Sequence, residues 1–475
     1  MRLDDVARAV IQRDGRDPDE VQRQLDLLAG GARFTRVARP CTRGDGIEVL
    51  PDPVDPEWLQ SWRVAAASGR ITAFVPASGA ATRMVAAMAK LAQLPEAVDE
   101  AELDRLADDP AYAAAVTVLR DPAALALWDP SMAAGEARST AGRIVEAVAG
   151  RPKALLPFHR YPDGSTRTAL EEHLDEAAAM EPGAPSVRVH FTLDPSLWDD
   201  ARAVVAAFAE RTGLTMRVDF SAQAPHTDTV ALGSGGLARG SDGATLYRPG
   251  GHGALIHNLE QLGGDLVLIK NIDNIVVERR RHEVVAWRSR LVARLLAVES
   301  EVHAALRALD DGDIARARDH AAHVGIAAPD ADGLRRLLYR PIRVCAMVEN
   351  RGEPGGGPFW VDTRGQQIVE ASQIDRSDPG QAGVLARATH FNPVDLACSV
   401  RDHRGQPYRL SDYVDPDAVI VTDKVVDGAS LRVLERPGLW NGAMAHWITR
   451  FVEVPVTLFQ PAKTLADLMR EGRRG

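Results

Sequence analysis

The chain has 475 residues, of which 45% are hydrophobic and 26% charged, and its net charge is −10 at pH 7. This length exceeds one minimal domain, and the composition is that of a soluble globular protein. The acidic balance disfavours a surface that coats nucleic acid, and no uncharged apolar stretch reaches membrane-spanning length. Three widely spaced cysteines without metal-ligand spacing, and an N-terminus without an apolar signal core, predict a cytoplasmic protein.

The first half of the chain predicts helices and a parallel sheet. Residues 1–68 are expected to form a mostly helical segment, followed by a strand at 71–75. Residues 85–150 are expected to form a helical insertion interrupted by prolines. Two further strands, at 187–192 and 214–220, flank a predicted helix, and strand–helix–strand at this spacing is a βαβ unit that favours a parallel sheet.

The second half continues the same pattern. The apolar run at 266–269 is bounded by turn residues, which is typical of a buried strand in a parallel sheet. Residues 278–325 are predicted to form two long exposed helices. We therefore expect an α/β catalytic domain over 69–410, completed by a C-terminal part, 411–475. Later strands are predicted at 342–348, 367–370, 419–421 and 451–454.

The segment VPASGAATRM follows the first strand and is the first candidate for chemistry. Backbone amides in a small-residue turn at the start of a helix attract phosphate oxygens, and Arg83 adds a charge that can fork onto phosphate. Glycine-rich turns are weak signals, so a tight turn that only permits close packing is an equal alternative.

Lys153 lies between Pro152 and Pro157, which hold the segment extended and would present a compact charge suited to phosphate. The alternative is an ordinary surface lysine. Downstream, residues 168–180 predict an amphipathic helix with solvated acids.

Three further segments offer groups for a nucleotide. Gln223 carries a donor and an acceptor together and can read a base edge. His252, in a glycine-histidine-glycine turn, could hydrogen-bond a phosphate or a sugar hydroxyl. Asp273 lies beyond the carboxyl end of the strand at 266–269, where ligands bind in open α/β sheets, and could hold Mg²⁺. Taken singly, a cap or a turn explains each residue equally well, and only their order favours a site.

The last third adds polar groups near strand ends and turns, namely Glu370, Asn392, Asp395, Glu435 and Asn441. Lys463 lies at a predicted helix start, where its charge opposes the helix dipole, so stability alone explains it poorly. The motifs GxSxG, HExxH and GxxxxGK[ST] are absent, which leaves electrostatic positioning of phosphates as the most coherent chemistry.

In this order the elements resemble those of the eukaryotic-type UDP-sugar pyrophosphorylases. Their GGxGTR-like loop is similar to residues 78–84, their PK element to Pro152-Lys153, and their base-contacting glutamine stretch to residues 223–225. Their PPGHGD and NxDN pair resembles residues 249–253 with 271–274. Their LLExxQ, FNxNN and VPRxxFxPVKT elements are similar to residues 368–373, 391–395 and 454–464.

The resemblance implies a glycosyltransferase-A-type, Rossmann-like nucleotidyltransferase fold, with a mixed, mostly parallel sheet flanked by helices. It also implies a reaction that joins a sugar 1-phosphate to a nucleoside triphosphate, UTP first, and that depends on Mg²⁺ held by Asp273. The implied catalytic residues are Arg83, Lys153 and Lys463. Nucleotide binding would fall to Ser78, Gly79, Ala80, Ala81, Thr82, Gln223 and Gly251, and sugar binding to His252, Glu370, Asn392 and Asn441.

Two departures from the family keep other functions open. Ala80 and Ala81 replace glycines of the phosphate loop, and the helical insertion separates Arg83 from Lys153. A sugar-nucleotide-binding protein that kept the fold without transfer chemistry is one alternative. A sugar-nucleotide-dependent glycosyltransferase is another, although it would not need both lysines.

Overall fold

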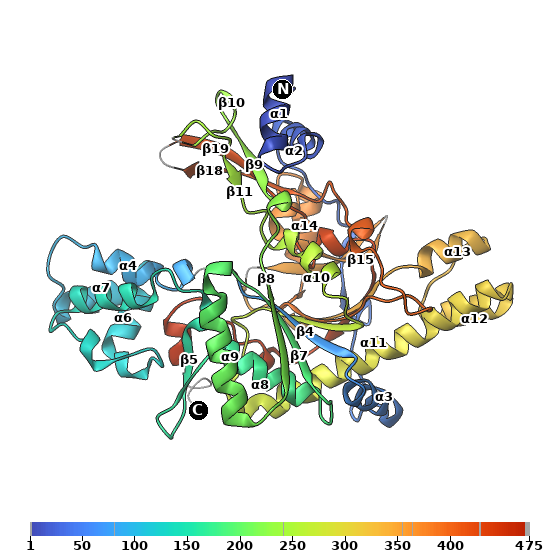
Figure 1. The fold of residues 1–475 in the computed structure, drawn as a ribbon, viewed down its shortest axis with the longest axis horizontal. Helices are drawn as coiled ribbons and strands as arrows, with labels where there is room; N and C mark the ends of the chain where they lie inside the picture. Colours follow the sequence, from blue (N-terminus) through green and yellow to red (C-terminus); the bar gives the residue numbers. More distant parts are fainter. Residues whose placement is uncertain are drawn as a thin grey trace.

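The apolar runs of the sequence form one large sheet at the centre of the molecule (Figure 1). The computed structural model describes residues 2–79, 81–240, 242–353, 355–362, 364–426 and 429–470. In spatial order the main strands are β2 (Thr42–Arg43), β3 (Gly46–Glu48), β20 (Ile448–Glu453), β13 (Ile342–Glu349), β17 (Asp395–Ser399), β12 (Leu266–Lys270), β4 (Ile71–Pro76), β7 (Val187–Thr192) and β8 (Met216–Ser221).

Strand direction confirms the predicted mixed, mostly parallel sheet. Each described neighbour pair in this order is parallel, except that β17 runs antiparallel to both β12 and β13. The strands β4, β7, β8, β12, β13 and β20 therefore end at the same edge. The side chains of β4, β12 and β13 are buried almost throughout, as expected for strands covered on both faces.

Alternation along β12 shows how the two faces are covered. Leu266 and Leu268 belong to a core cluster shared with α3 (Pro56–Ala67) and α11 (Arg281–Asp310). Val267 and Ile269 point to the opposite face, where they pack with residues at the start of α10 (Ile256–Gln261). The prediction that residues 278–325 form two exposed helices is right for the elements, α11 and α12 (Ile314–His323), and wrong for the exposure of α11. Its inward face is buried along most of its length, because it packs on the sheet and on α3.

The helical insertion is confirmed as α4 (Ala86–Ala92), α5 (Glu100–Ala107), α6 (Ala113–Arg120) and α7 (Ala137–Val148), which lie to one side of the sheet (Figure 1). Its core is continuous with that of β4, β7 and α8 (Ala169–Met180). The C-terminal residues Leu465, Leu468 and Met469 pack into the same cluster.

Strands from residues 229–248 and 420–435 form a second sheet, of which the sequence predicted only the strand at 419–421. Its strands are β10 (Gly236–Leu237), β9 (Thr229–Gly233), β19 (Ala429–Glu435) and β18 (Ile420–Val426), with β11 (Tyr247–Arg248) on the other side of β9. The helices α1 (Asp5–Arg13) and α2 (Pro18–Gly30) pack on it. A third sheet joins β1 (Arg39–Pro40), β14 (Gly356–Val361) and β15 (Gly365–Glu370), so the expected mostly helical segment 1–68 also contains three short strands.

The remaining elements complete the connections between these layers. They are β5 (Pro157–Arg160), β6 (Thr166–Thr168), α9 (Trp198–Thr212), α13 (Ala331–Leu338), α14 (Pro379–Ala386) and β16 (His390–Phe391).

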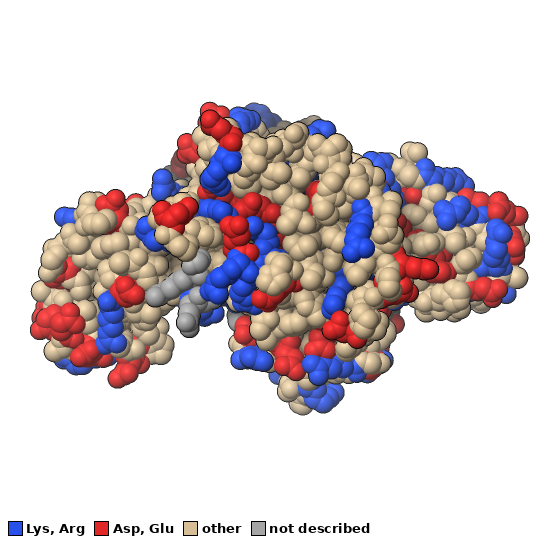
Figure 2. Space-filling model, turned by 90° about the horizontal axis from the view of Figure 1, so that it is seen from below, with Lys and Arg blue, Asp and Glu red and all other residues tan. Residues whose placement is uncertain are grey.

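On the face drawn in Figure 2, acidic and basic side chains are interspersed. Cys41, Cys345 and Cys398 are all buried and free. Among the described residues, no helix combines the length and the apolar character needed to cross a lipid bilayer.

Candidate active site

The predicted site residues gather along the carboxyl edge of the central sheet. β4, β8 and β12 are followed there by residues 78–83, by Gln223 and by Asp273, respectively. The ends of parallel strands meet at one edge, and this is where ligands bind in open α/β sheets.

Three elements that are far apart in the sequence meet at Asp273. Lys153 Nζ lies 2.6 Å from Asp273 Oδ2 and also donates to the carbonyl oxygen of Ala462, at 3.2 Å. The amide of Ala462 donates in turn to the backbone oxygen of Asp273, at 3.0 Å. Beside them, the Asn274 side chain accepts from the amide of Gln460. The segments at Lys153, at residues 271–274 and at residues 460–463 therefore form one hydrogen-bonded unit.

The predicted phosphate loop lies next to this unit. The amide of Lys153 is 3.5 Å from the carbonyl oxygen of Gly79, which brings the loop after β4 to the lysine. Ser78, Gly79, Thr82 and Arg83 are exposed, whereas Ala81 is buried in the core shared with the insertion. Ala80 lies outside the described residues.

Two of the predicted catalytic cations have exposed side chains. Arg83 ends a short 3-10 turn and, within the described ranges, forms no ion pair. Lys463 directly follows Ala462, and its Nζ lies 6.0 Å from the centre of the Phe459 ring. Its backbone is held by Asp467, whose Oδ2 accepts from the amides of Lys463 and Thr464 at 2.9 and 2.7 Å.

Gln223 follows β8 with a buried amide nitrogen, Nε2, that has no hydrogen-bond partner within the described residues. A buried amide without a partner costs free energy unless a ligand satisfies it. Asn258, on α10, holds the chain just before Gln223, because its Nδ2 donates to Ser221 Oγ at 2.7 Å and to the oxygen of Ala222 at 2.8 Å. Sequence analysis did not identify Asn258.

The turn at residues 250–253, ahead of α10, needs glycines because of its backbone conformation and close packing. Gly251 has φ 74°, and a Cβ on Gly250 would lie 2.4 Å from the oxygen of Thr227. A Cβ on Gly253 would lie 2.2 Å from the oxygen of Pro437. The turn is thereby fixed between the segment after Gln223 and the segment that leads to Asn441.

His252 is positioned by the same packing. Its ring stacks on Trp440 with 4.3 Å between centroids, and its Nδ1 accepts from the amide of Leu439 at 3.1 Å. Burial lowers the pKa of His252 to about 4, so the ring is neutral at pH 7. With Nδ1 as the acceptor, Nε2 carries the proton and is a hydrogen-bond donor.

Glu370 and Asn441 lie together on this side of the site. Asn441 Nδ2 donates to Glu370 Oε1 at 3.0 Å, and its buried Oδ1 has no partner within the described residues. Burial raises the pKa of Glu370, and the charge of Glu435 adds to this shift. Gly438 packs closely between His252 and Asn441. A Cβ at this position would lie 2.5 Å from the His252 ring and 3.1 Å from Asn441 Nδ2.

Asn392 is the predicted sugar residue whose side chain does not join this group. Its Nδ2 donates to the oxygen of Ala346 at 2.9 Å, its Oδ1 accepts from the amide of Val394 at 3.1 Å, and it is 4% exposed. The backbone therefore uses both polar ends of its amide. Asn392 supports the turn at Val394, which has φ 57°.

A buried ionic network behind Asp273 was missed. Lys270, the last residue of β12, is bound by both carboxylate oxygens of Glu176, which also pairs with Arg288 at 2.7 Å. Burial alone would raise the pKa of Glu176, but Lys270 and Arg288 hold it at about 2. The prediction that residues 168–180 carry ordinary solvated acids is thus wrong for Glu171, Glu172 and Glu176, which are buried. The sequence held one sign of this network, because the apolar strand at 266–269 is followed directly by the charged residue Lys270.

Comparison with solved structures supports the fold. The UDP-N-acetylglucosamine pyrophosphorylase of Trypanosoma brucei, solved with an inhibitor, aligns over 98% of this chain and 79% of its own, with TM-score 0.51 and 14% identity. A singly substituted UDP-glucose pyrophosphorylase of Leishmania major in complex with UDP-glucose aligns over the same shares, with TM-score 0.49 and 14% identity. The chain therefore shares the fold of UDP-sugar pyrophosphorylases.

Two comparisons of sequence complete the assignment. No curated protein matches the chain. One family model matches residues 5–120 and 146–474, leaving out only part of the helical insertion and the chain ends. The chain belongs to the family described as a domain of unknown function, DUF4301.

Proposed function

We propose that this protein is a nucleotidyltransferase that joins a sugar 1-phosphate to a nucleoside triphosphate, UTP first, and releases pyrophosphate. The observation that carries the proposal is the meeting of Lys153, Asp273 and the segment ending at Lys463. A binding site for a neutral ligand has no need for a lysine and a carboxylate that meet beside a third segment carrying Lys463.

In the proposed reaction a sugar phosphate oxygen attacks the α-phosphorus, and the bond from that phosphorus to the bridging oxygen of pyrophosphate breaks. No covalent intermediate with the enzyme is needed. Catalysis then consists of holding the two substrates in line and neutralising phosphate charge. Lys153 would neutralise the α-phosphate, Arg83 with the Ser78-Gly79 turn would hold the β- and γ-phosphates, and Lys463 would hold the sugar phosphate.

Asp273 fits the role of a magnesium ligand. Its Oδ1 accepts no hydrogen bond from the described residues, and Mg²⁺ is commonly held by one or two carboxylates together with water and substrate phosphates. When bound, the ion would supply further neutralisation of phosphate charge. In its absence the ion pair with Lys153 keeps the Asp273 carboxylate oriented.

The remaining residues would select the substrates. The buried, unpartnered Nε2 of Gln223 suits a base carbonyl, and Gly251 would lie against the nucleoside. On the sugar side, His252 Nε2–H would donate to a hydroxyl or phosphate oxygen. The pair of Glu370 and Asn441 would accept from sugar hydroxyls, with Asn392 supporting the adjacent turn from behind.

The direct test is pyrophosphate release from each nucleoside triphosphate with a panel of sugar 1-phosphates, in the presence of Mg²⁺. We expect turnover with at least one sugar phosphate, fastest with UTP. Lys153→Ala should abolish most of it, whereas Lys90→Ala, an exposed lysine on α4, should not. Tight UTP binding without turnover for any pair would contradict the proposal and favour a sugar-nucleotide-binding protein.

A further inference from the structure

A group of metal-binding side chains lies between α11 and α12, at the opposite end of the molecule from the helical insertion (Figure 1). It consists of Glu301 on α11 and of His320 and His323 on α12. Each residue offers one ligand atom, and these atoms lie within 4.8 Å of one another. Within the described ranges, no other group of three or more histidine, cysteine, aspartate or glutamate side chains meets this condition. The group has no residue in common with the candidate active site, where Asp273 would hold the ion.

The three side chains meet at a single carboxylate oxygen. Glu301 Oε2 lies 2.8 Å from His320 Nδ1 and 3.1 Å from His323 Nδ1. In a tetrahedral zinc site with bonds of about 2.1 Å, the ligand atoms lie about 3.4 Å apart. The two contacts with Oε2 therefore need to lengthen by only a few tenths of an ångström to admit an ion, which small rotations of the side chains supply. Exposed ion pairs contribute little to stability, so stability alone explains poorly why two histidines meet one oxygen.

The helices that carry these side chains are held in place by apolar packing. A turn at residues 311–313 joins α11 to α12, and buried residues of both helices, among them Ala305 and Ala321, belong to one core cluster. Residues three apart on a helix lie on the same side, so His320 and His323 both reach Glu301. Because the backbone is already fixed, little ordering is needed when an ion binds.

The donor atoms of this group suit a transition-metal ion and not Mg²⁺. Imidazole nitrogens favour ions such as Zn²⁺, Ni²⁺ and Cu²⁺, whereas Mg²⁺ prefers oxygen ligands. Two histidines and one glutamate are the protein ligands of one class of zinc site, in which the fourth position stays open. Hydrogen bonds from His320 and His323 lower the pKa of Glu301, so its carboxylate is ionised at pH 7.

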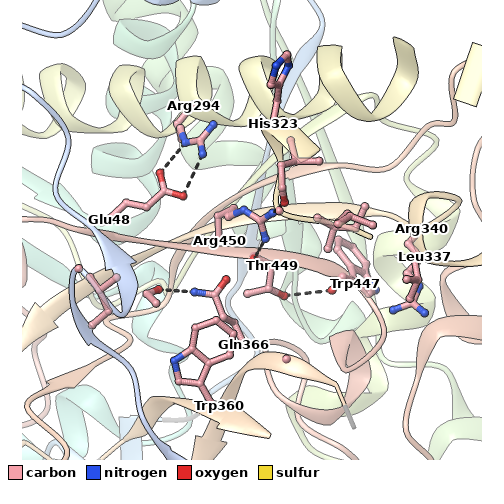
Figure 3. A pocket seen from close by; sticks show the side chains of 18 of the residues that line it. Glu48, Arg294, His323, Leu337, Arg340, Trp360, Gln366, Trp447, Thr449 and Arg450 are labelled. Carbon is pink, nitrogen blue, oxygen red and sulfur yellow. Dashed lines mark hydrogen bonds and ion pairs between the residues drawn. The ribbon is translucent and has the colours of Figure 1, made fainter. Parts of the chain in front are cut away.

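The group is open to solvent through His323. The His323 side chain is 66% exposed. It also lines a cavity of about 1040 Å³, where it lies above Arg450 in the view of Figure 3. This exposure gives an ion an entry path and leaves room for water at the remaining coordination position.

We propose that Glu301, His320 and His323 bind one divalent transition-metal ion, Zn²⁺ first, through Glu301 Oε2 and the two Nδ1 atoms. The ion takes the place of the protons that the histidines donate to the carboxylate, and water completes its coordination. It links α11 to α12, so it stabilises the folded chain by mass action. The proposal does not depend on the transferase activity, because the ligands lie outside the candidate active site.

The test is titration calorimetry of the full chain with Zn²⁺, after a chelator has removed bound metal. Excess Mg²⁺ is present throughout, because it fills oxygen sites such as that proposed at Asp273 and competes weakly for imidazole. We expect saturable binding of Zn²⁺ at one tight site per chain and a higher melting temperature with the ion than without it. Absence of saturable Zn²⁺ binding would overturn the proposal, whatever the turnover of the protein.

Single substitutions of the three ligands locate the ion. Glu301→Gln, His320→Gln and His323→Gln should each weaken Zn²⁺ binding about tenfold or more and remove the rise in melting temperature, because each takes away one bond to the ion. His282→Gln, an exposed histidine on α11, is the matched control and should bind Zn²⁺ like the wild type. Melting temperatures of the metal-free variants verify folding. Wild-type affinity for Zn²⁺ in any folded ligand variant would show that the ion does not bind at this group.

Discussion

Lys153 and Asp273 are 120 residues apart in the sequence, and their side chains form an ion pair with 2.6 Å between Nζ and Oδ2. The two side chains are only 13% and 19% exposed. Lys153 reaches the pair from the end of the helical insertion, and Asp273 follows the central strand β12. The pair therefore joins the insertion to the central sheet at the edge where phosphates are proposed to bind.

A double-mutant cycle separates the structural role of this pair from its chemical role. Lys153→Met and Asp273→Asn should each lower the free energy of unfolding, and the double variant should lose less than the sum of the two. We expect Lys153→Met to lower turnover by a barrier of about 2–4 kcal/mol, as for other preorganised charges. Urea unfolding and pyrophosphate release measure the two effects. Turnover close to wild type in Lys153→Met would remove this lysine from the mechanism.

Arg83 should matter for the ligand and not for the fold. Its side chain is exposed and has no ion-pair partner among the described residues, so Arg83→Ala should change stability by no more than about 0.5 kcal/mol. We expect the same variant to weaken binding of UTP about tenfold and to leave UMP binding nearly unchanged, since the lost contact is to the outer phosphates. Calorimetric titration with both nucleotides tests this, and Arg202→Ala on α9 is the control. Equal weakening of UTP and UMP binding would mean that Arg83 does not contact the outer phosphates.

Gln223 should select the base. Because its buried Nε2 has no partner within the described residues, a ligand carbonyl is expected to satisfy it. Gln223→Ala should cost about 1–3 kcal/mol of uridine nucleotide binding, which is a loss of roughly 5- to 150-fold in affinity. The exposed Gln261→Ala, at the end of α10, provides the comparison. If affinities for UTP and CTP both stay at wild-type values in Gln223→Ala, the base lies elsewhere.

Substitution by alanine should lower the melting temperature at Gly253 and leave it nearly unchanged at Gly79. Gly253→Ala places a methyl group 2.2 Å from the oxygen of Pro437, so the turn or the neighbouring segment must move. Gly79→Ala meets nothing within 4 Å. We expect a clearly lower melting temperature and weakened nucleotide binding for Gly253→Ala, and a melting temperature near wild type for Gly79→Ala. Thermal unfolding of both variants decides this, and equal melting temperatures would show that the packing around Pro437 is looser than described.

The network of Lys270, Glu176 and Arg288 predicts a dependence of stability on pH. The pKa of Glu176 is about 2 in the folded state, against an ordinary value of 4.5. A carboxylate with a lowered folded pKa contributes stability above its unfolded pKa, and this contribution is lost as pH falls from about 4.5 towards 2. Glu176→Gln should therefore cost about 3–5 kcal/mol at pH 7, because it leaves buried cations short of a partner.

Urea unfolding at several pH values provides the measurement. The difference between wild type and Glu176→Gln should shrink as the pH is lowered below 4.5, while Glu210→Gln, an exposed acid on α9, should match wild type throughout. If the difference in free energy of unfolding between wild type and Glu176→Gln stays constant from pH 7 to pH 3, the lowered pKa of Glu176 is not the cause of the stability loss.

The sequence predicted the elements whose signal is local. The strand at 187–192 and the run at 266–269 appear where their apolar patterns place them, because strands buried on both faces are apolar throughout. The order of the polar residues favoured one site, and the family resemblance assigned residues 79, 153, 223 and 273 to it.

The features that were missed depend on contacts between distant residues. Glu172 and Glu176 have the spacing of a solvated helix face. Packing of α8 buries both, with Glu172 against His159 and Arg281 and Glu176 against Lys270 and Arg288. The strand β1 has only two residues and cannot show alternation, and the partners of β1 and β9 come from the distant residues 356–361 and 429–435. Asn392 likewise resembles a ligand-binding amide until its two backbone partners are known.

The packing of residues 465–469 against the helical insertion links the three proposed catalytic cations. Arg83 precedes the first helix of the insertion, Lys153 follows its last, and Leu465 donates its amide to the oxygen of Met84 while its side chain enters the same apolar cluster. Lys463 is two residues from that anchor. Loosening of this apolar cluster would therefore disturb the positions of all three cations at once, including the ion pair of Lys153 with Asp273.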